Sequence, residues 1–177
     1  MTIKPSAEVG EAVRHLLAEK DMTNEQMADD LNISKQLVSH YKNDRRTMQQ
    51  DIAKQSIRLY EDSPEYIGEL IYKFSDGYTS PVLKGPAIER HRLALKAHAE
   101  KGLAEALTEV GALCLAKPPG MADEEEKESI AQMMDKLLEA RMFIDNFMMA
   151  IERDYGIPMK KGMKRLVLQW KANRWLA

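Results

Sequence analysis

One stretch, residues 22–46, constrains the fold of this chain more than any other because it carries two helix-start signals in quick succession. Thr23, followed three residues later by Gln26, forms a capping box, which predicts a helix beginning directly after Thr23. Ser34 is a second N-cap residue. Asn32 lies between the two signals and tolerates the left-handed backbone that a tight turn needs. The stretch therefore predicts two short helices joined by a tight turn.

The second of these helices, expected over 35–42, has one apolar and one polar side. Val38 and Tyr41 are its inner residues, and Ala28 in the first helix is small where the two helices must approach closely. Hydrogen-bonding groups that suit base edges and phosphates occupy the outer positions, which are Lys35, Gln36, Ser39 and His40. An ordinary helical hairpin with a solvated polar surface is the alternative interpretation.

A basic loop follows this helix. Asn43, Arg45 and Arg46 are residue types that bind phosphate well. The segment 35–46 holds four cations against one acid, in a chain whose formal net charge is −2. Contact with DNA would therefore come from a local patch rather than from bulk charge.

The stretch resembles the helix-turn-helix of the Cro/CI repressor family, also called the XRE family. The residues that carry this resemblance are Thr23, Glu25, Gln26, Met27, Ala28, Leu31, Ile33, Ser34, Val38, Ser39 and Arg45. It extends over roughly residues 6–74 and implies a five-helix DNA-binding domain whose second motif helix enters the major groove. No counterpart of the family pattern is recognised in the rest of the chain.

The pattern and the resemblance together predict two sets of contact residues. The residues expected to contact bases are Lys35, Gln36, Ser39 and His40. The residues expected to contact phosphates are Asn24, Ser34, Asn43, Arg45 and Arg46. Two positions depart from the family pattern: Asp44 stands where glycine is usual, and Leu37 where a polar residue is common. We expect Leu37 to touch a thymine methyl group or to pack against a partner.

Three further helices complete the expected DNA-binding domain, 1–74. Pro5 and Ser6 suggest the start of the first, Thr47 with Gln50 forms a capping box for the second, and Pro64 suits the first position of the third. Apolar residues recur at helical spacing in each. Their expected ranges are about 6–20, 48–60 and 64–74.

A segment rich in glycine, proline and serine, 75–86, predicts a linker, which Tyr78, Val82 and Leu83 could pin to a neighbouring surface. Residues 87–177 are then expected to form a helical domain for oligomerisation or partner binding. One long helix should run from Pro86 to about Lys117, with Leu95, Leu103, Leu107 and Val110 among its apolar stripe.

A second long helix should begin at the acidic run 123–126, after the break at 118–120. Its apolar residues Ile130, Leu137, Ile144 and Ile151 recur every seven residues, which is coiled-coil spacing. The two helices should form an antiparallel hairpin whose apolar stripes are covered by a second copy of the chain. The residues expected at this contact are Ile130, Leu137, Ile144, Met148 and Ile151. Packing onto the N-terminal domain or the last helix is the alternative.

The last segment, 159–177, is basic, contains two tryptophans and has no acidic side chain. Such a helix can cap a bundle, with its basic face on the acidic run 123–126. It can also bind nucleic acid, a membrane surface or an acidic partner. The capping role is the simplest interpretation.

Several kinds of chemistry have no signature in the sequence. We find no glycine-rich phosphate loop, zinc pattern or nucleophile elbow, so we expect no cofactor and no metal, and an enzyme is the class favoured least. The single cysteine, Cys114, excludes an intrachain disulfide and is expected in the core. The N-terminus lacks a signal-peptide pattern, and no apolar run has membrane-spanning length, so we expect a cytoplasmic protein without membrane contact.

The sequence thus predicts an all-α protein that binds double-stranded DNA as a homodimer or higher homo-oligomer. The expected function is a sequence-specific transcriptional regulator, a repressor of phage or mobile-element type. The self-cleaving, β-rich domain of CI-type repressors has no counterpart in the helical C-terminal half. Release from DNA would therefore need a regulatory protein partner, a ligand or dilution. The alternative is an interaction adaptor, such as an antitoxin, an anti-defence protein or a replication-control protein, that uses the helix-turn-helix as a binding surface.

Overall fold

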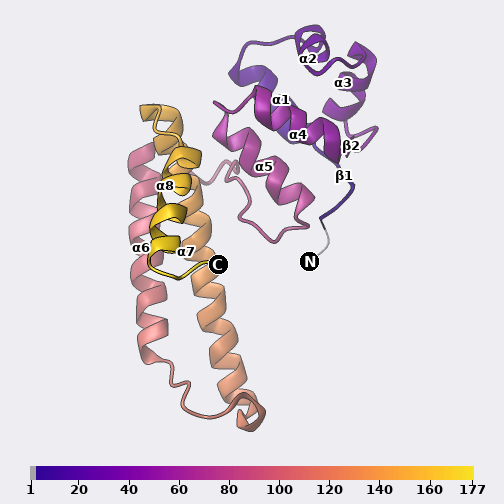
Figure 1. Ribbon diagram of the computed structural model, residues 1–177. Coiled ribbons are helices and arrows are strands. Elements are labelled where there is room, and N and C mark those ends of the chain that lie inside the picture. Colours follow the sequence, from indigo (N-terminus) through magenta and orange to yellow (C-terminus); the bar gives the residue numbers. More distant parts are fainter. Residues whose placement is uncertain (1–2) are drawn as a thin grey trace. The chain divides into compact units, whose positions relative to one another are not determined.

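The computed structural model describes residues 3–177 and is mostly helical, which confirms the all-α prediction at the level of fold class (Figure 1). In chain order its elements are β1 (Ser6–Ala7), α1 (Gly10–Glu19), α2 (Asn24–Leu31), α3 (Lys35–Lys42), β2 (Met48–Gln49), α4 (Gln50–Leu59), α5 (Pro64–Phe74), α6 (Arg92–Ala112), a short 3-10 helix (Pro119–Met121), α7 (Glu124–Tyr155) and α8 (Met159–Ala172). Among these helices, none has the length and apolar character needed to cross a membrane.

The chain separates into two compact units. One combines the residues up to Val82 with Tyr155–Ala177, and the other is Leu83–Asp154. The sequence-based division had placed all of 87–177 in one domain. Within the first unit, Lys160 Nζ in α8 forms an ion pair with Glu61 Oε2 at 3.0 Å. A contact between residues so far apart in sequence leaves no trace in local periodicity.

The core of the first unit is built by α1 to α5 and β2. Its largest fully buried apolar side chains are Val9, Val13, Leu16, Met27, Leu31, Val38, Met48, Tyr66 and Leu70. Each large apolar side chain removed from water contributes about 1.5–3 kcal/mol to stability. The inner sides of α2 and α3 pack on this shared core, which fixes their positions.

A polar chain of hydrogen bonds crosses this core. The Tyr66 hydroxyl donates to Ser56 Oγ at 3.0 Å, and Ser56 Oγ donates to the Ala53 carbonyl at 2.9 Å. The Tyr60 hydroxyl donates to Asp30 Oδ2 in α2 at 2.9 Å, and its ring meets that of Tyr66 edge to face. Burial raises the pKa of Tyr66 to about 12. The network joins α2 to the pair α4 and α5.

Two predicted helix starts in this unit are wrong, because the residues concerned form a small antiparallel sheet. Ser6 pairs with Gln49 and Ala7 with Met48, so that α1 begins only at Gly10 and α4 only at Gln50. The capping box expected at the start of α4 is absent. Backbone groups of the two segments bond each other instead, a long-range pairing that a local pattern does not reveal.

The second unit is an antiparallel hairpin of α6 and α7. Its two helices meet through small residues: a Cβ atom added to Gly102 would lie 3.2 Å from Ala140 Cα. Ala99 and Ala106 are also buried on this face of α6. The two helices therefore approach closely at Gly102, whereas no atom lies within 4 Å of a Cβ atom added to Gly111.

Several expectations for α6 are wrong. The helix begins at Arg92 with His91 as N-cap, not at Pro86, and it ends at Ala112 rather than near Lys117. Leu95 of the predicted stripe is buried, but Leu103, Leu107 and Val110 are exposed because Ala99, Gly102 and Ala106 occupy the buried face of α6 farther along the helix. Cys114 is also exposed instead of buried, since it lies beyond the helix end. In the preceding linker, the Tyr78 side chain is exposed.

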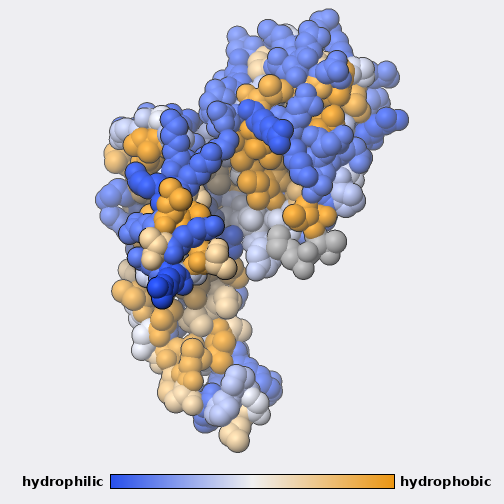
Figure 2. All heavy atoms as spheres, viewed as in Figure 1, coloured by the Kyte–Doolittle hydropathy of each residue, from blue (hydrophilic) through white to orange (hydrophobic). Residues whose placement is uncertain are grey.

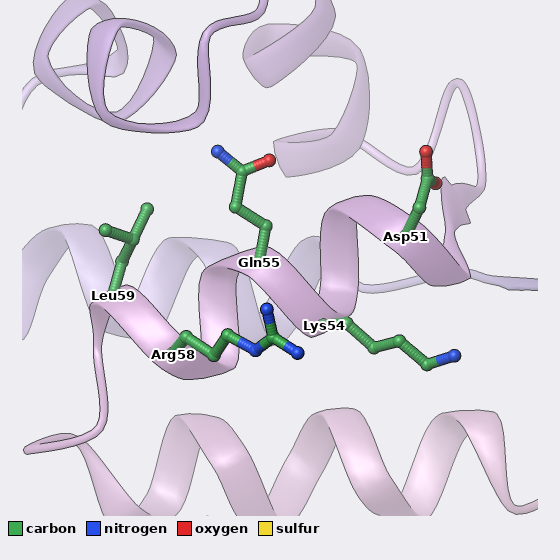
Figure 3. A pocket seen from close by; sticks show the side chains of 5 residues that line it. All are labelled: Asp51, Lys54, Gln55, Arg58 and Leu59. Atoms are coloured by element: carbon green, nitrogen blue, oxygen red, sulfur yellow. The ribbon is translucent and has the colours of Figure 1, made fainter.

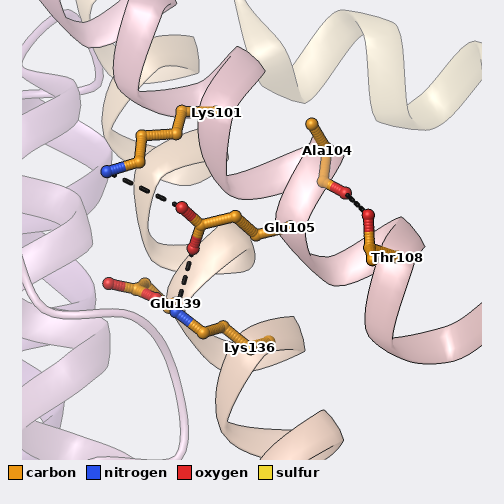
Figure 4. A network of polar contacts seen from close by, with 6 residues as sticks. All are labelled: Lys101, Ala104, Glu105, Thr108, Lys136 and Glu139. Atoms are coloured by element: carbon orange, nitrogen blue, oxygen red, sulfur yellow. Dashed lines mark hydrogen bonds and ion pairs between the residues drawn. The ribbon is translucent and has the colours of Figure 1, made fainter. Parts of the chain in front are cut away.

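An ion-pair network spans the same helix pair at its surface (Figure 4). Glu105 lies between Lys101 Nζ at 3.6 Å and Lys136 Nζ at 2.9 Å, and Glu139 also pairs with Lys136. The hydrogen bond from Lys136 holds the pKa of Glu105 below its usual value, and the two carboxylates raise the pKa of Lys136. These charges are solvent-exposed, so they orient the helices more than they stabilise them.

The start of α7 agrees with the sequence. Asp123 Oδ1 accepts from the Glu126 backbone N–H at 2.9 Å, and Glu126 Oε2 accepts from the Asp123 N–H at 3.1 Å. Lys117 Nζ pairs with Glu126 at 2.8 Å. The acidic run is therefore a solvated, capped first turn.

Candidate nucleic-acid interface

The turn between α2 and α3 has the predicted geometry. Thr23 Oγ1 accepts from the Gln26 backbone N–H at 3.2 Å, and Gln26 Oε1 accepts from the Thr23 N–H at 2.7 Å, which completes the capping box. Asn32 ends α2 in the left-handed conformation, with φ 52° and ψ 47°. The Ile33 N–H then donates to the Ala28 carbonyl at 2.9 Å, which closes the turn.

The second helix of the motif, α3, is held at its start and along its inner side. Ser34 Oγ accepts from the Leu37 backbone N–H at 3.1 Å, as expected for an N-cap. Val38 and Tyr41 are buried, and the small Ala28 is buried between the two helices. Because its start is capped and its inner side is packed, α3 presents its outer side chains from a rigid frame.

The side chains expected to contact bases lie on the outer side of α3. Lys35 and Gln36 are exposed, and Ser39 and His40 are half-buried. Lys35 Nζ forms an ion pair with Glu25 Oε2 at 3.1 Å, so binding a base would require Lys35 to exchange this partner. The helix therefore carries one occupied cation and three polar side chains within reach of a ligand.

The side chains expected to contact phosphates differ in how free they are. Asn43 Nδ2 already donates to the Ser39 carbonyl at 2.8 Å, and the Ser34 hydroxyl accepts the cap bond but keeps its own proton to donate. Asn24 is half-buried. Arg45 and Arg46 are exposed and form no ion pair with any described residue. The two arginines are thus the most available donors of this set.

Asp44, which departs from the family pattern, has a structural role. Its backbone is left-handed, with φ 53°, the conformation that also favours glycine. Its Oδ1 accepts from the backbone N–H of Gly10 at 2.7 Å, and Oδ2 lies 3.9 Å from Arg14 NH1. The carboxylate therefore satisfies a free N–H at the positive end of α1, and its charge is directed there.

Arg14 adds a second link between α1 and the end of α3, because its guanidinium donates to the Lys42 carbonyl. Gly10 is required for this close approach, since a Cβ atom there would lie 2.3 Å from Asp44 Oδ2. Sequence reasoning missed this arrangement because its partners are more than 25 residues apart. In the sequence, Gly10 itself was the only sign of this arrangement.

Leu37 does not stand outward as predicted. It is half-buried and packs against the core of the first unit. The reason is its position one residue before the inner Val38, on the flank of α3 that faces the core. The core thus takes up part of the Leu37 side chain, and only the remaining part is left for a thymine methyl group or a partner.

The outer face of α4 adds a basic surface that the sequence analysis did not single out (Figure 3). Lys54 and Arg58 extend from the same side of the helix, beside Asp51, Gln55 and Leu59, around a shallow hollow of about 520 Å³. Neither cation forms an ion pair within the described part of the chain. Their spacing of four residues was the available signal.

No protein-family model, curated protein or solved structure matches this chain. Among residues 3–177, no group of three or more histidine, cysteine or acidic side chains is placed to hold a metal ion. The candidate interface therefore rests on the geometry of α2, α3 and the loop 43–46.

Proposed function

We propose that the chain is a sequence-specific DNA-binding transcriptional regulator whose α3 enters the major groove of double-stranded DNA. The observation that carries the proposal is the combination of a capped, rigidly packed α3 with accessible Gln36, Ser39 and His40 on its outer side. Gln36 would pair with adenine through two hydrogen bonds, and Lys35 would reach guanine acceptors after leaving Glu25.

Phosphate contacts would come from the loop after α3. Arg45 and Arg46 are exposed and without ion pairs among the described residues, and Asp44 no longer opposes them because its carboxylate is bound to α1. The resemblance of the motif to the Cro/CI family supports a repressor of phage or mobile-element type. Phosphate contacts of this kind set the register of a protein on DNA, and base contacts supply the specificity.

Homodimerisation through the second unit belongs to the same proposal. Ile130, Ile144 and Ile151 are only half-buried, and Leu137 and Met148 are 38% and 40% exposed. Figure 2 shows apolar side chains gathered along the α6–α7 hairpin. Pairing of two hairpins would cover them, and the two α3 helices would read half-sites about 34–36 Å apart.

Two departures from the family pattern do not favour the adaptor alternative, because Leu37 packs against the core and Asp44 caps α1. Exposed apolar side chains of the second unit, such as Leu137 and Met148, remain compatible with a protein partner. Copurification of a stoichiometric protein, together with no enriched DNA sequence, would favour the adaptor.

Selection of bound sites from random duplex DNA tests the proposal. We expect a preferred sequence with two related halves, and Gln36→Ala should lose discrimination at one position of each half by about 1–3 kcal/mol. The matched control is Gln132→Ala, an exposed glutamine on α7, which should select the wild-type sequence. Identical selections by the Gln36 variant and the control would remove Gln36 from the base-contacting set.

A further inference from the structure

The basic side chains of α8 are set apart from most others in the chain by their lack of acidic partners. Cations elsewhere commonly form ion pairs, for example Lys20 with Asp62 at 2.7 Å and Lys96 with Glu100 at 2.6 Å. On α8 only Lys160 does so. The cations of the last segment that form no ion pair within residues 3–177 are Lys161, Lys164, Arg165, Lys171 and Arg174.

Four of these cations, together with Lys160, gather on one side of α8, whereas Arg174 lies beyond the end of the helix. At 3.6 residues per turn, Lys160, Lys164 and Lys171 fall within an arc of about 40°, and Lys161 and Arg165 extend it to about 140°. All five side chains are exposed. Since 159–177 has no acidic side chain, this arc forms a positive surface, interrupted by Leu168, in a chain of net charge −2.

The apolar side of α8 is used differently. Met159, Val167 and Trp170 are half-buried, but Met163 and Leu166 on the same side are exposed, and Leu168 in the middle of the basic arc is 70% exposed. A helix that lies on a membrane presents its apolar side to the lipid. Here the basic side faces solvent, and the apolar side is only partly covered because Met163 and Leu166 are exposed. The choice of a polyanion therefore rests on the unpaired cations, and binding to lipid is an outcome of the test.

We propose that this basic face of α8, defined by Lys161, Lys164, Arg165 and Lys171, binds the phosphate backbone of DNA. Lysine acts as a point charge without directional selectivity, which suits a repeating polyanion and carries no base information. α8 belongs to the same compact unit as α3. The inference rests on the proposed function for the choice of DNA as the ligand. The attraction of the α8 cations to phosphate does not depend on that function.

The test is the salt dependence of duplex binding by the full chain. Each phosphate neutralised contributes about 0.9 to the slope of log K against log salt. Replacing Lys161, Lys164, Arg165 and Lys171 by glutamine should reduce the slope by about 3 to 4 per chain and weaken selected and unrelated duplexes by the same factor. The selected sequence itself should not change.

Two control variants separate charge from structure. Exchanging Lys161, Lys164 and Lys171 for arginine keeps the charge and should preserve the slope. Replacing Lys96 and Lys127, exposed lysines of the second unit that already form ion pairs, by glutamine should also leave it unchanged. Circular dichroism should show equal helix content in every variant.

The outcomes distinguish this inference from the proposed function. If a sequence is selected but the glutamine variant changes the slope by less than about one unit, the α8 inference is overturned and the function stands. If no sequence is selected but unrelated duplex is bound with a slope that falls in the variant, the function fails and the α8 surface stands. If the variant instead loses only binding to anionic lipid vesicles, or if the unaltered chain binds no duplex at low salt, the inference is overturned.

Discussion

The α2–α3 pair and the α6–α7 pair are both two-helix units, but different forces hold them together. In α2–α3 each helix start is capped by a side chain three residues away, and the turn needs one left-handed residue. In α6–α7 the helices meet along small side chains, and the connection between them is long. Residues close together in the sequence can therefore specify the short α2–α3 motif. The structure of the long α6–α7 hairpin depends instead on which face of each helix packs against the other.

The largest expected effect tests the small-residue contact of the hairpin. Gly102→Leu should lower the free energy of unfolding by about 1–3 kcal/mol or more, because the new side chain would press on the backbone of Ala140. Gly111→Leu is the matched control, since open space surrounds that position, and it should be neutral or stabilise by up to about 1 kcal/mol. Urea unfolding of both variants measures the difference. Equal effects would mean that the close approach at Gly102 does not hold the hairpin together.

An intermediate effect is expected where α1 meets the end of α3. Asp44→Ala should cost about 0.5–2 kcal/mol, because the Gly10 N–H loses its acceptor. Gly10→Ala should also destabilise, since its methyl group would displace the carboxylate. In the double variant the two losses should not add, because both remove the same contact. Fully additive losses in thermal unfolding would show that the two residues act independently.

The smallest effect concerns the polar network behind α2. Tyr66→Phe removes the hydrogen bond to Ser56 and should cost about 0.5–1.5 kcal/mol at neutral pH. Since burial raises the pKa of Tyr66 to about 12 in the folded chain, its contribution is complete below the unfolded value near 10 and is lost as the pH rises toward 12.

Unfolding measured between pH 9 and about 11.5 should therefore show a steeper loss of stability in the unaltered chain than in Tyr66→Phe. Tyr78→Phe is the control, because that tyrosine is exposed, and it should follow the unaltered chain. Parallel curves for all three proteins would exclude Tyr66 as a source of the alkaline loss.

The predictions made from sequence succeeded or failed according to how local their evidence was. The caps Thr23 and Ser34, the turn at Asn32 and the inner pair Val38 and Tyr41 lie where expected, because each depends on residues within one helical turn. The starts of α1 and α4 were wrong because their first residues form a sheet with each other. The stripe of α6 was correct at Leu95 but wrong at Leu103, Leu107 and Val110, because large apolar residues were assumed to face inward along the whole helix.

The same contrast applies within the candidate interface. The outer positions of α3 follow from its period once the inner residues are known, so Lys35 and Gln36 are exposed as expected. The role of Asp44 could not be derived, since its partner Gly10 belongs to another helix. Leu37 was assigned outward because a helix of eight residues leaves its flank positions ambiguous.

By itself, then, the sequence determined the motif of α2 and α3, the helical class of the chain and the basic character of its last segment. Caps, periodicity and charge are properties of residues close together along the chain, and they need no knowledge of what lies opposite. Only the tertiary structure decided that Asp44 caps α1, that Gly102 and Ala106 rather than Leu103 and Leu107 lie on the buried face of α6, and that α8 falls into the first unit. Those outcomes depend on contacts between distant residues, whose energy exists only once the whole chain has folded.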